Sequence, residues 1–242
     1  GIAIGDPSEK EPAPAAWTQT AIAKDVGPIL AETIAEAFVR RAIAHPDNIV
    51  AADRLSGALT YRRMLIGARL LAKQLERLEG DAVGIMLPAS VAADLVFFAA
   101  HMAGKLPVMM NWTTGPANMS HAVETLEIKH IVTSKKFVDR LHIEIEGAEF
   151  AFLEDIRKNI GKLSSLRLLI TSYLASGSFL RSLPKQNPDQ PAVVLFTSGS
   201  ESTPKAVPLT HRNLLTNIRD GMKILKLGDA DSLLGFLPPF HS

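Results

Sequence analysis

The pattern of apolar and polar positions divides the chain into amphipathic helices and short buried strands. The clearest helical stripe lies between Thr60 and Gly80, where apolar residues recur at i, i+3, i+4 and i+7. Thr60 is a suitable N-cap for this helix, and Gly80 is a suitable end. A second stripe begins after Pro28 and stops at Pro46, where the two prolines favour a helix start and a helix end. Both stripes are typical of helices that pack on a core.

Further along the chain, short apolar runs alternate with stretches of helical length. Strands are expected at 49–52, 82–87, 106–110, 130–133, 192–196 and 232–237, and helices at 90–103, 116–126, 135–141 and after Thr210. A weaker strand–helix pair is expected within 149–169, a turn at Ser56 and Gly57, and a loop at 172–190. Nearly continuous apolar strands joined by helices indicate parallel pairing with both faces buried. The sequence therefore predicts a doubly wound α/β fold, in which helices flank a mostly parallel sheet and ligands bind beyond the carboxyl ends of its strands.

Composition excludes several classes of function. The chain has 242 residues, enough for a sizeable core, and its formal net charge of +1 shows no basic excess for binding nucleic acid. It has no cysteine, so it has no disulfide framework, thiolate metal site or cysteine nucleophile. The longest apolar stretch, Val91 to Ala103, is shorter than the roughly 20 residues that span a bilayer. These features fit a cytoplasmic protein. Residues 1–27 start with a segment rich in proline, alanine and charge, and are expected to form a flexible linker or tail.

A loop rich in hydroxyl groups follows the apolar run that ends at Phe196. Six of the seven residues from Thr197 to Thr203 are serine, threonine or glycine, and Pro204 and Lys205 come next. Small residues let a backbone approach a ligand closely, and free amides and hydroxyls offer several donors to an anion. Lys205 adds a positive charge at the end of the loop. The loop has the chemistry of a polyphosphate cradle, although serine-rich loops are also common as plain solvated turns.

The Walker A loop is one alternative that the residues exclude. That motif needs G-x-x-x-x-G-K-[ST] at the start of a helix. In this chain Pro204 stands directly before Lys205, where Walker A has glycine, and Ala206 stands where it has the metal-binding hydroxyl.

The segment from Phe196 to Leu214 resembles the phosphate-binding signature of the adenylate-forming (AMP-binding) ligases. That signature is roughly [YF]-T-S-G-[ST]-[TE]-G-x-P-K-G, followed by a short strand and T-H-x-N at a helix start. The matching residues are Thr197, Ser198, Gly199, Ser200, Pro204, Lys205, Thr210, His211 and Asn213. Ser202 and Ala206 stand where the family usually has glycine, and each adds a side chain near the expected phosphate position. The ending LPPFH, with its histidine at His241, is similar to the family's next motif, L-P-x-[FY]-H.

The resemblance implies a site and a reaction. The residues expected around the phosphates of ATP are Thr197, Ser198, Gly199, Ser200, Glu201, Ser202, Thr203 and Lys205. Lys205 and His241 are the implied catalytic residues, with His241 orienting the carboxylate. In the implied reaction a fatty acid attacks Mg-ATP to give an acyl-adenylate and pyrophosphate, and a pantetheine thiol of acyl carrier protein or coenzyme A then takes the acyl group.

The chain resembles one branch of the family in particular. The segments at 106–116 and 130–134 are similar to the acyl-carrier-protein synthetase domain of the bifunctional 2-acylglycerophosphoethanolamine acyltransferases, and Glu201 suits that branch. This resemblance implies an acyltransferase domain upstream and peripheral association of the full-length protein with the bacterial inner membrane.

The resemblance also implies that residues 28–242 are the N-terminal part of an AMP-binding domain. Family members continue into a ligand for Mg²⁺ and a C-terminal lid with a second catalytic lysine, so the chain is expected to be inactive alone. Two alternatives stay open. One is a non-catalytic nucleotide- or acyl-binding module, or a ligase whose loop has degenerated at Ser202 and Ala206. The other is an amino-acid adenylation domain, which the acyl-type WTTGP segment at 112–116 disfavours.

Overall fold

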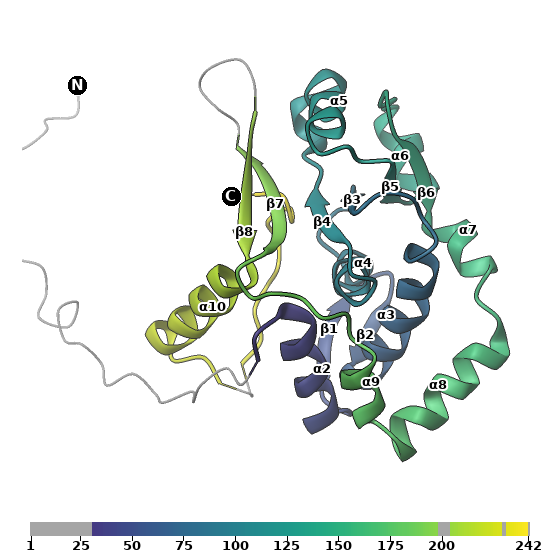
Figure 1. Cartoon of the computed structure of the whole chain (residues 1–242), viewed down its shortest axis with the longest axis vertical. Helices are drawn as coiled ribbons and strands as arrows, with labels where there is room; N and C mark the ends of the chain where they lie inside the picture. The colour runs from purple at the N-terminus through teal and green to yellow at the C-terminus, as the bar shows by residue number, and fades with distance from the viewer. Residues whose placement is uncertain (1–30, 198–203, 229–230, 242) are drawn as a thin grey trace, which may run out of the picture.

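A six-stranded sheet forms the centre of the molecule (Figure 1). The computed structural model describes residues 31–197, 204–228 and 231–241. The strands are β3 (Ala82–Ile85), β4 (Leu106–Met109), β5 (His130–Thr133), β6 (Glu149–Phe152), β7 (Pro191–Thr197) and β8 (Lys205–Thr210). Their order is β6-β5-β3-β4-β7-β8; the first five strands in this order run parallel, and β8 is antiparallel to β7. This arrangement confirms the predicted mostly parallel sheet.

Helices cover both faces of the sheet. The helices of one face are α2 (Ile34–Ala44), α3 (Tyr61–Leu75), α4 (Val91–Met102) and α9 (Gly177–Arg181), and those of the other are α5 (Pro116–Thr125) and α6 (Lys135–Leu141). The strands supply both cores because successive side chains point to opposite faces. In β7, Val193 belongs to the cluster with α2, α3 and α4, and Val194 belongs to the cluster with α5. The doubly wound prediction is therefore confirmed.

The chain changes direction at β3. It passes from β3 through α4 to β4, which lies on one side of β3 in the sheet. It then passes from β4 through α5 to β5, which lies on the other side of β3. The two connecting helices lie on opposite faces of the sheet, as right-handed crossovers require. In open α/β sheets such a switch leaves a crevice beyond the carboxyl ends of the strands.

Polar caps explain where the predicted helices begin. Ser90 and Ser134 accept hydrogen bonds from backbone amides in the first turns of α4 and α6, both at 3.2 Å. Thr60 does the same for α3. Helix α3 ends at Leu75 rather than continuing to Gly80, which has φ +81° in the turn before β3. That backbone conformation suits glycine because it has no Cβ.

A small hairpin precedes α3. Strand β1 (Ile49–Asp53) was expected, but its antiparallel partner β2 (Gly57–Thr60) was predicted only as a turn. Helix α2 begins at Ile34, where Thr33 is the N-cap, and ends at Ala44, close to Pro46.

Two other predictions were wrong. The segment 172–190, expected as a loop, contains the end of α8 (Lys162–Leu174) and the whole of α9. Helix α9 forms there because Phe179 is buried in the core. The weaker strand–helix pair expected within 149–169 is confirmed, as β6 followed by α7 (Leu153–Lys158) and the start of α8. The segment 232–237 forms no strand: it contains a glycine and no β-branched residue, and it pairs with no strand of the sheet. Within the described residues, no helix is long and apolar enough to cross a bilayer.

Candidate functional site

The β7–β8 hairpin carries the predicted phosphate loop at its tip. Thr197, at the end of β7, is the Cα partner of Lys205, at the start of β8. Six predicted site residues between them lie outside the described residues: Ser198, Gly199, Ser200, Glu201, Ser202 and Thr203. Because β7 runs parallel to β4, Thr197 ends β7 at the same edge where β4 also ends. The hairpin tip therefore lies at the carboxyl edge of the sheet, where the fold favours ligands.

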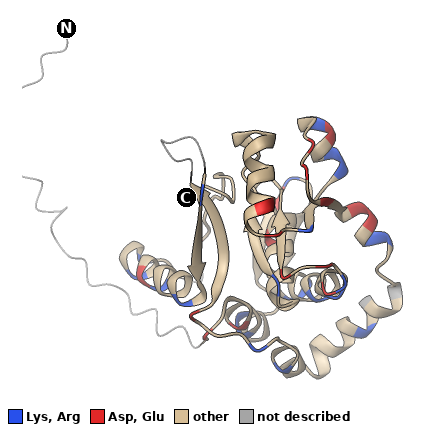
Figure 2. Cartoon of the chain, turned by 45° about the horizontal axis from the view of Figure 1, so that its top comes forward, with Lys and Arg blue, Asp and Glu red and all other residues tan. Residues whose placement is uncertain are grey.

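Lys205 is exposed and has no ion-pair partner within the described part of the chain. The described residues of the hairpin include no carboxylate (Figure 2). Residues directly opposite in an antiparallel pair point to the same face, so Lys205 and Thr197 share one face of the hairpin. An ammonium group and a hydroxyl thus stand together, one at each end of the predicted loop.

Ala206, one of the two departures from the family pattern, points the other way. It is the Cα partner of Phe196, and both pack in the apolar cluster on the α5 side of the sheet. The methyl group of Ala206 therefore contacts the core rather than the face that carries Lys205. The other departure, Ser202, lies outside the described residues.

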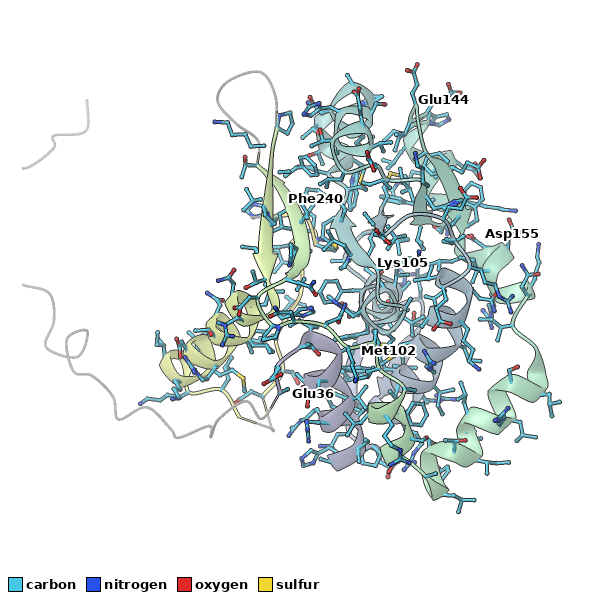
Figure 3. The ribbon with its side chains drawn as sticks, viewed as in Figure 1. Glu36, Met102, Lys105, Glu144, Asp155 and Phe240 are labelled. Carbon is cyan, nitrogen blue, oxygen red and sulfur yellow. The ribbon has the colours of Figure 1, made fainter. Side chains whose placement is uncertain are left out.

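An aromatic cluster fastens the C-terminal segment to the carboxyl edge. Trp112 lies in the short 3-10 helix η2 (Trp112–Thr114), just beyond β4. Its ring meets Phe137 edge-on at a centroid distance of 5.0 Å and Phe240 at 4.4 Å. Phe240 is buried beside the sheet (Figure 3). The motif around Phe240 thus packs where β4 ends.

His241 follows this anchor directly. Its side chain is exposed, and its backbone amide donates a 2.9 Å hydrogen bond to the carbonyl of Pro238. The structure therefore places His241 and the hairpin tip at one edge of the sheet. Sequence reasoning missed Phe240 and Trp112 as the residues that hold His241 there, although Phe240 stands immediately before His241 in the motif.

Most of the chain matches a known family. Residues 38–242 match the AMP-binding enzyme family. The chain belongs to this family. It is 29% identical over 194 residues to 4-coumarate–CoA ligase 4 of Arabidopsis thaliana, a match that covers 76% of this chain and 34% of the plant protein. It is 25% identical over 196 residues to 2-succinylbenzoate–CoA ligase of Staphylococcus aureus, covering 75% of this chain and 38% of that protein.

Solved structures share the fold of this AMP-binding chain. The o-succinylbenzoate CoA synthetase of Bacillus subtilis, in complex with an acyl-adenylate intermediate, superposes with a TM-score of 0.65 at 18% identity, over 84% of this chain and 50% of that one. The N-terminal subdomain of NpsA from Klebsiella oxytoca superposes with a TM-score of 0.58 at 20% identity, over 76% of this chain and 44% of that one. The chain spans about a third of the length of the curated relatives named above.

In this AMP-binding chain His211, from the T-H-x-N motif, docks the hairpin onto the helical layer. His211 is buried at the start of α10 (His211–Leu225), and its Nδ1 accepts a 3.2 Å hydrogen bond from the amide of Ile34, the first residue of α2. Thr210 and Asn213 form a reciprocal capping box there. A small apolar cluster of Ile34, Ala192 and Leu215 surrounds the contact. The motif thus stabilises the base of the hairpin that carries the loop.

His101, on α4, lies beside His211 with a ring-centroid distance of 5.3 Å. It is fully buried, and neither ring nitrogen has a hydrogen-bond partner in the described structure. Burial, and then the neighbouring His211, lower the pKa of His101 to about 3. This histidine is therefore a neutral core residue at physiological pH.

Three clefts lie elsewhere on the described part of the molecule. Clefts of about 270, 220 and 590 Å³ lie beside α8, α2 and α5, and Thr197, Lys205 and His241 line none of these three. Within the described ranges, no group of three or more histidine, aspartate or glutamate residues could hold a metal ion.

Proposed function

We propose that the protein containing this chain activates a fatty acid with Mg-ATP as an acyl-adenylate and transfers the acyl group to a pantetheine thiol, of acyl carrier protein or coenzyme A. The observation that carries the proposal is the pairing of Lys205 with Thr197. A free ammonium and a hydroxyl flank the family's phosphate loop on one face, at the carboxyl edge of the sheet. Family membership and the CoA-ligase relatives support the same reaction class.

The chemistry of these donors fits a triphosphate. ATP, when bound, supplies the α-phosphate that the carboxylate attacks and the pyrophosphate that leaves. The Lys205 ammonium stabilises the negative charge of the phosphates, and the hydroxyl of Thr197 donates a hydrogen bond to a phosphate oxygen. Ser198, Gly199, Ser200, Glu201, Ser202 and Thr203 are proposed to complete the cradle. His241, exposed beside the buried Phe240, orients the carboxylate.

The finer assignment is to the acyl-carrier-protein synthetase branch. Its support is the sequence of the segments at 106–116 and 130–134, and Trp112 of the first segment lies at the candidate site. We include in the proposal an upstream acyltransferase domain and association of the full-length protein with the inner membrane. Residues 1–27 are a linker in this scheme, and 28–242 are the N-terminal part of the AMP-binding domain.

Binding of ATP tests the role of Lys205. Lys205→Ala is expected to weaken ATP binding about 10- to 100-fold, the worth of a charge-assisted hydrogen bond of about 1.5–3 kcal/mol. Equilibrium dialysis with radiolabelled ATP measures this, and Lys223→Ala on α10 is the matched control. Equal losses in the two variants would contradict a specific role for Lys205.

A second measurement tests the expected inactivity of the chain alone. Incubation with ATP, Mg²⁺, a fatty acid and radiolabelled pyrophosphate is expected to give no exchange of label into ATP. Steady exchange would refute this part of the proposal. Exchange that depends on an amino acid instead would favour an amino-acid adenylation domain.

Restoring the family's glycines separates an adapted loop from a degenerate one. Because the Ala206 methyl packs with Phe196 in the core, Ala206→Gly is expected to leave ATP affinity unchanged within about twofold and to lower stability by about 1 kcal/mol. Ser202→Gly is expected to change affinity little as well. A large gain in ATP affinity in either variant would favour a degenerate ligase or a non-catalytic module.

A further inference from the structure

Helix α8 presents six large apolar side chains to solvent. They are Leu163, Leu166, Leu169, Ile170, Tyr173 and Leu174, with exposed fractions between 41% and 81%. The side of α8 that faces the molecule carries Leu168, Thr171 and Ser172, which are buried or half-buried. In Figure 1 the helix lies at the periphery, at the end of the molecule away from the hairpin tip. A core-packing helix turns its apolar side to the core, whereas α8 turns its apolar side to solvent.

The apolar side chains form one continuous surface. At 100° per residue they fall within an arc of about 140° around the helix axis, and Arg167 lies at the edge of that arc. A 13-residue helix is about 20 Å long, so the surface extends over several turns. Arg62 of α3 fastens one end: its guanidinium lies 3.8 Å from the centroid of the Tyr173 ring, and its Nη1 donates to the carbonyl of Ser172 at 3.2 Å. An exposed surface of this kind marks an interaction site.

Positive charge surrounds this surface. The stretch 156–188, which contains α8 and α9, has six lysine and arginine residues and no aspartate or glutamate. Helix α3, which packs on α8, has four basic residues and no acidic one; Arg62 and Arg69 are paired with Asp47 and Glu76 outside the helix. In Figure 2 the described part of α8 carries blue and no red. The surroundings of the apolar surface thus complement a negatively charged partner.

A cationic cleft borders α8 on the side that faces the molecule, between α3, α8 and α9, and Arg167 lies between this cleft and the edge of the apolar surface. Its volume is about 270 Å³, and no acidic residue lines it. Its charged lining residues are Arg69, Lys73 and Arg167, and its hydroxyl groups come from Ser164, Thr171, Ser178 and Ser182. Arg69 is paired with Glu76 at 3.1 Å, whereas Lys73 and Arg167 have no acidic partner among the described residues. Two free cations and several hydroxyls are suited to a phosphate group.

We propose that α8 docks this protein on the surface of an anionic phospholipid bilayer, with its apolar side chains in the headgroup–acyl boundary and the phosphates facing Lys73 and Arg167. Interfacial helices combine an apolar face with basic residues in this way, and lie about 5–10 Å deep in the boundary region. The proposal does not depend on the ATP-dependent reaction. It assigns the membrane contact to the surface of this chain, whatever lies upstream.

The same charges argue against a second copy of the chain as the occupant. A two-fold dimer through α8 would bring the same surface from each subunit together. The unpaired cations around both copies of α8 would then face each other, and such like-charge contacts are costly. A bilayer that carries anionic lipid satisfies the apolar and the cationic parts together.

A single introduced thiol gives a local test, because the chain has no cysteine. Leu166→Cys is labelled with a polarity-sensitive fluorophore, and Leu234→Cys, at another exposed leucine, is the matched control. Vesicles of phosphatidylcholine with about 30% phosphatidylglycerol, a fraction that gives a negative surface potential, are expected to shift the emission at position 166 to the blue. Position 234 is expected to stay unchanged, as is position 166 with pure phosphatidylcholine.

Co-sedimentation with the same vesicles tests both parts of the surface. Leu166→Ser with Ile170→Ser is expected to weaken binding at least tenfold, because the two apolar side chains that would be buried in the bilayer are lost, together with the free energy of their burial. Leu233→Ser with Leu234→Ser, a larger loss of exposed apolar surface elsewhere, is expected to have no effect. Each of Lys73→Gln and Arg167→Gln is expected to weaken binding about fivefold. Circular dichroism checks that every variant is folded.

Three results would overturn the proposal. The first is no binding to anionic vesicles by the folded chain. The second is equal binding to neutral vesicles and insensitivity to the basic substitutions. The third is a label at position 166 that is already blue-shifted without vesicles, which would show that protein covers α8. Sedimentation velocity would then identify a second copy as the cover, or exclude it.

Discussion

At the scale of single residues, His101 is a buried histidine without a hydrogen-bond partner in the described structure. Two unpaired nitrogens in a core cost free energy that an apolar residue of similar size would not. Its ring and the ring of Phe97 meet in a T-shaped arrangement at a centroid distance of 4.7 Å, so its surroundings are partly apolar. We interpret His101 as a packing residue of α4 that makes the fold sensitive to acid.

The pKa of His101 sets the direction of this sensitivity. The folded pKa is about 3, well below the ordinary value, so the unfolded chain binds a proton that the folded chain does not. Stability is therefore fully present above about pH 6.5, and falls by about 1.4 kcal/mol per pH unit as the pH drops towards the folded pKa.

Substitution of His101 tests this linkage. His101→Leu is expected to flatten the fall in unfolding free energy between pH 6.5 and 4.5 by about 1.4 kcal/mol per unit, without loss of stability at pH 7. Urea unfolding followed by circular dichroism at several pH values measures it. The control is His142→Asn: His142 is exposed, and its positive φ of 51° is tolerated by asparagine. An unchanged pH dependence in His101→Leu would contradict the prediction.

At the scale of elements, local signals explain which helices and strands were predicted. Ser90, Ser134 and Thr210 cap the helices that the periodicity indicated. Local signals failed where pairing or burial decided the outcome. Strand β2 exists because it pairs with β1, and α9 is held by Phe179 in the core, whereas the apolar segment 232–237 pairs with no strand.

Two glycines show how an element's surroundings change the effect of one substitution. A Cβ at Gly84, in the central strand β3, would lie 2.9 Å from Cγ1 of Ile131 and 3.2 Å from Cγ of Met110. Gly84→Ala is therefore expected to lower the unfolding free energy by about 1–3 kcal/mol through overpacking. A Cβ at Gly221, in α10, meets nothing within 4 Å, so Gly221→Ala is expected to raise it by about 0.5–1 kcal/mol. Denaturant titrations of both variants measure the two signs; a gain at Gly84 or a loss at Gly221 would contradict this account.

At the scale of the whole molecule, the candidate site is assembled from distant parts of the sequence. β4 leads to Trp112, β7 and β8 carry the loop, and the end of the chain supplies Phe240 and His241. The resemblance in sequence pointed to Lys205 and His241 separately. Their placement at one edge follows from the strand order and from the Trp112–Phe240 contact, neither of which a local pattern contains.

Removal of the aromatic anchor tests this assembly. Phe240→Ala is expected to expose the Trp112 ring and shift its fluorescence to the red, measured in a Trp17→Phe background so that only Trp112 emits. Truncating a buried phenylalanine costs about 3–5 kcal/mol where the surroundings cannot relax. A terminal segment can detach instead, so faster proteolysis of 231–241 is expected with a smaller loss of global stability. Phe236→Ala, at an exposed phenylalanine, is the control, and an equal red shift there would contradict the anchor.

The sequence by itself determined the alternation of helices and strands, the class of the fold and the chemistry of the serine-rich loop. These depend on periodicity, caps and residue types within a few positions of one another. Only the tertiary structure decided the strand order, the face that carries Lys205 with Thr197, the docking of Phe240 on Trp112 and the outward orientation of α8. The physical reason is that these features depend on contacts between residues far apart in the chain, and on which surfaces remain uncovered once the two cores are filled.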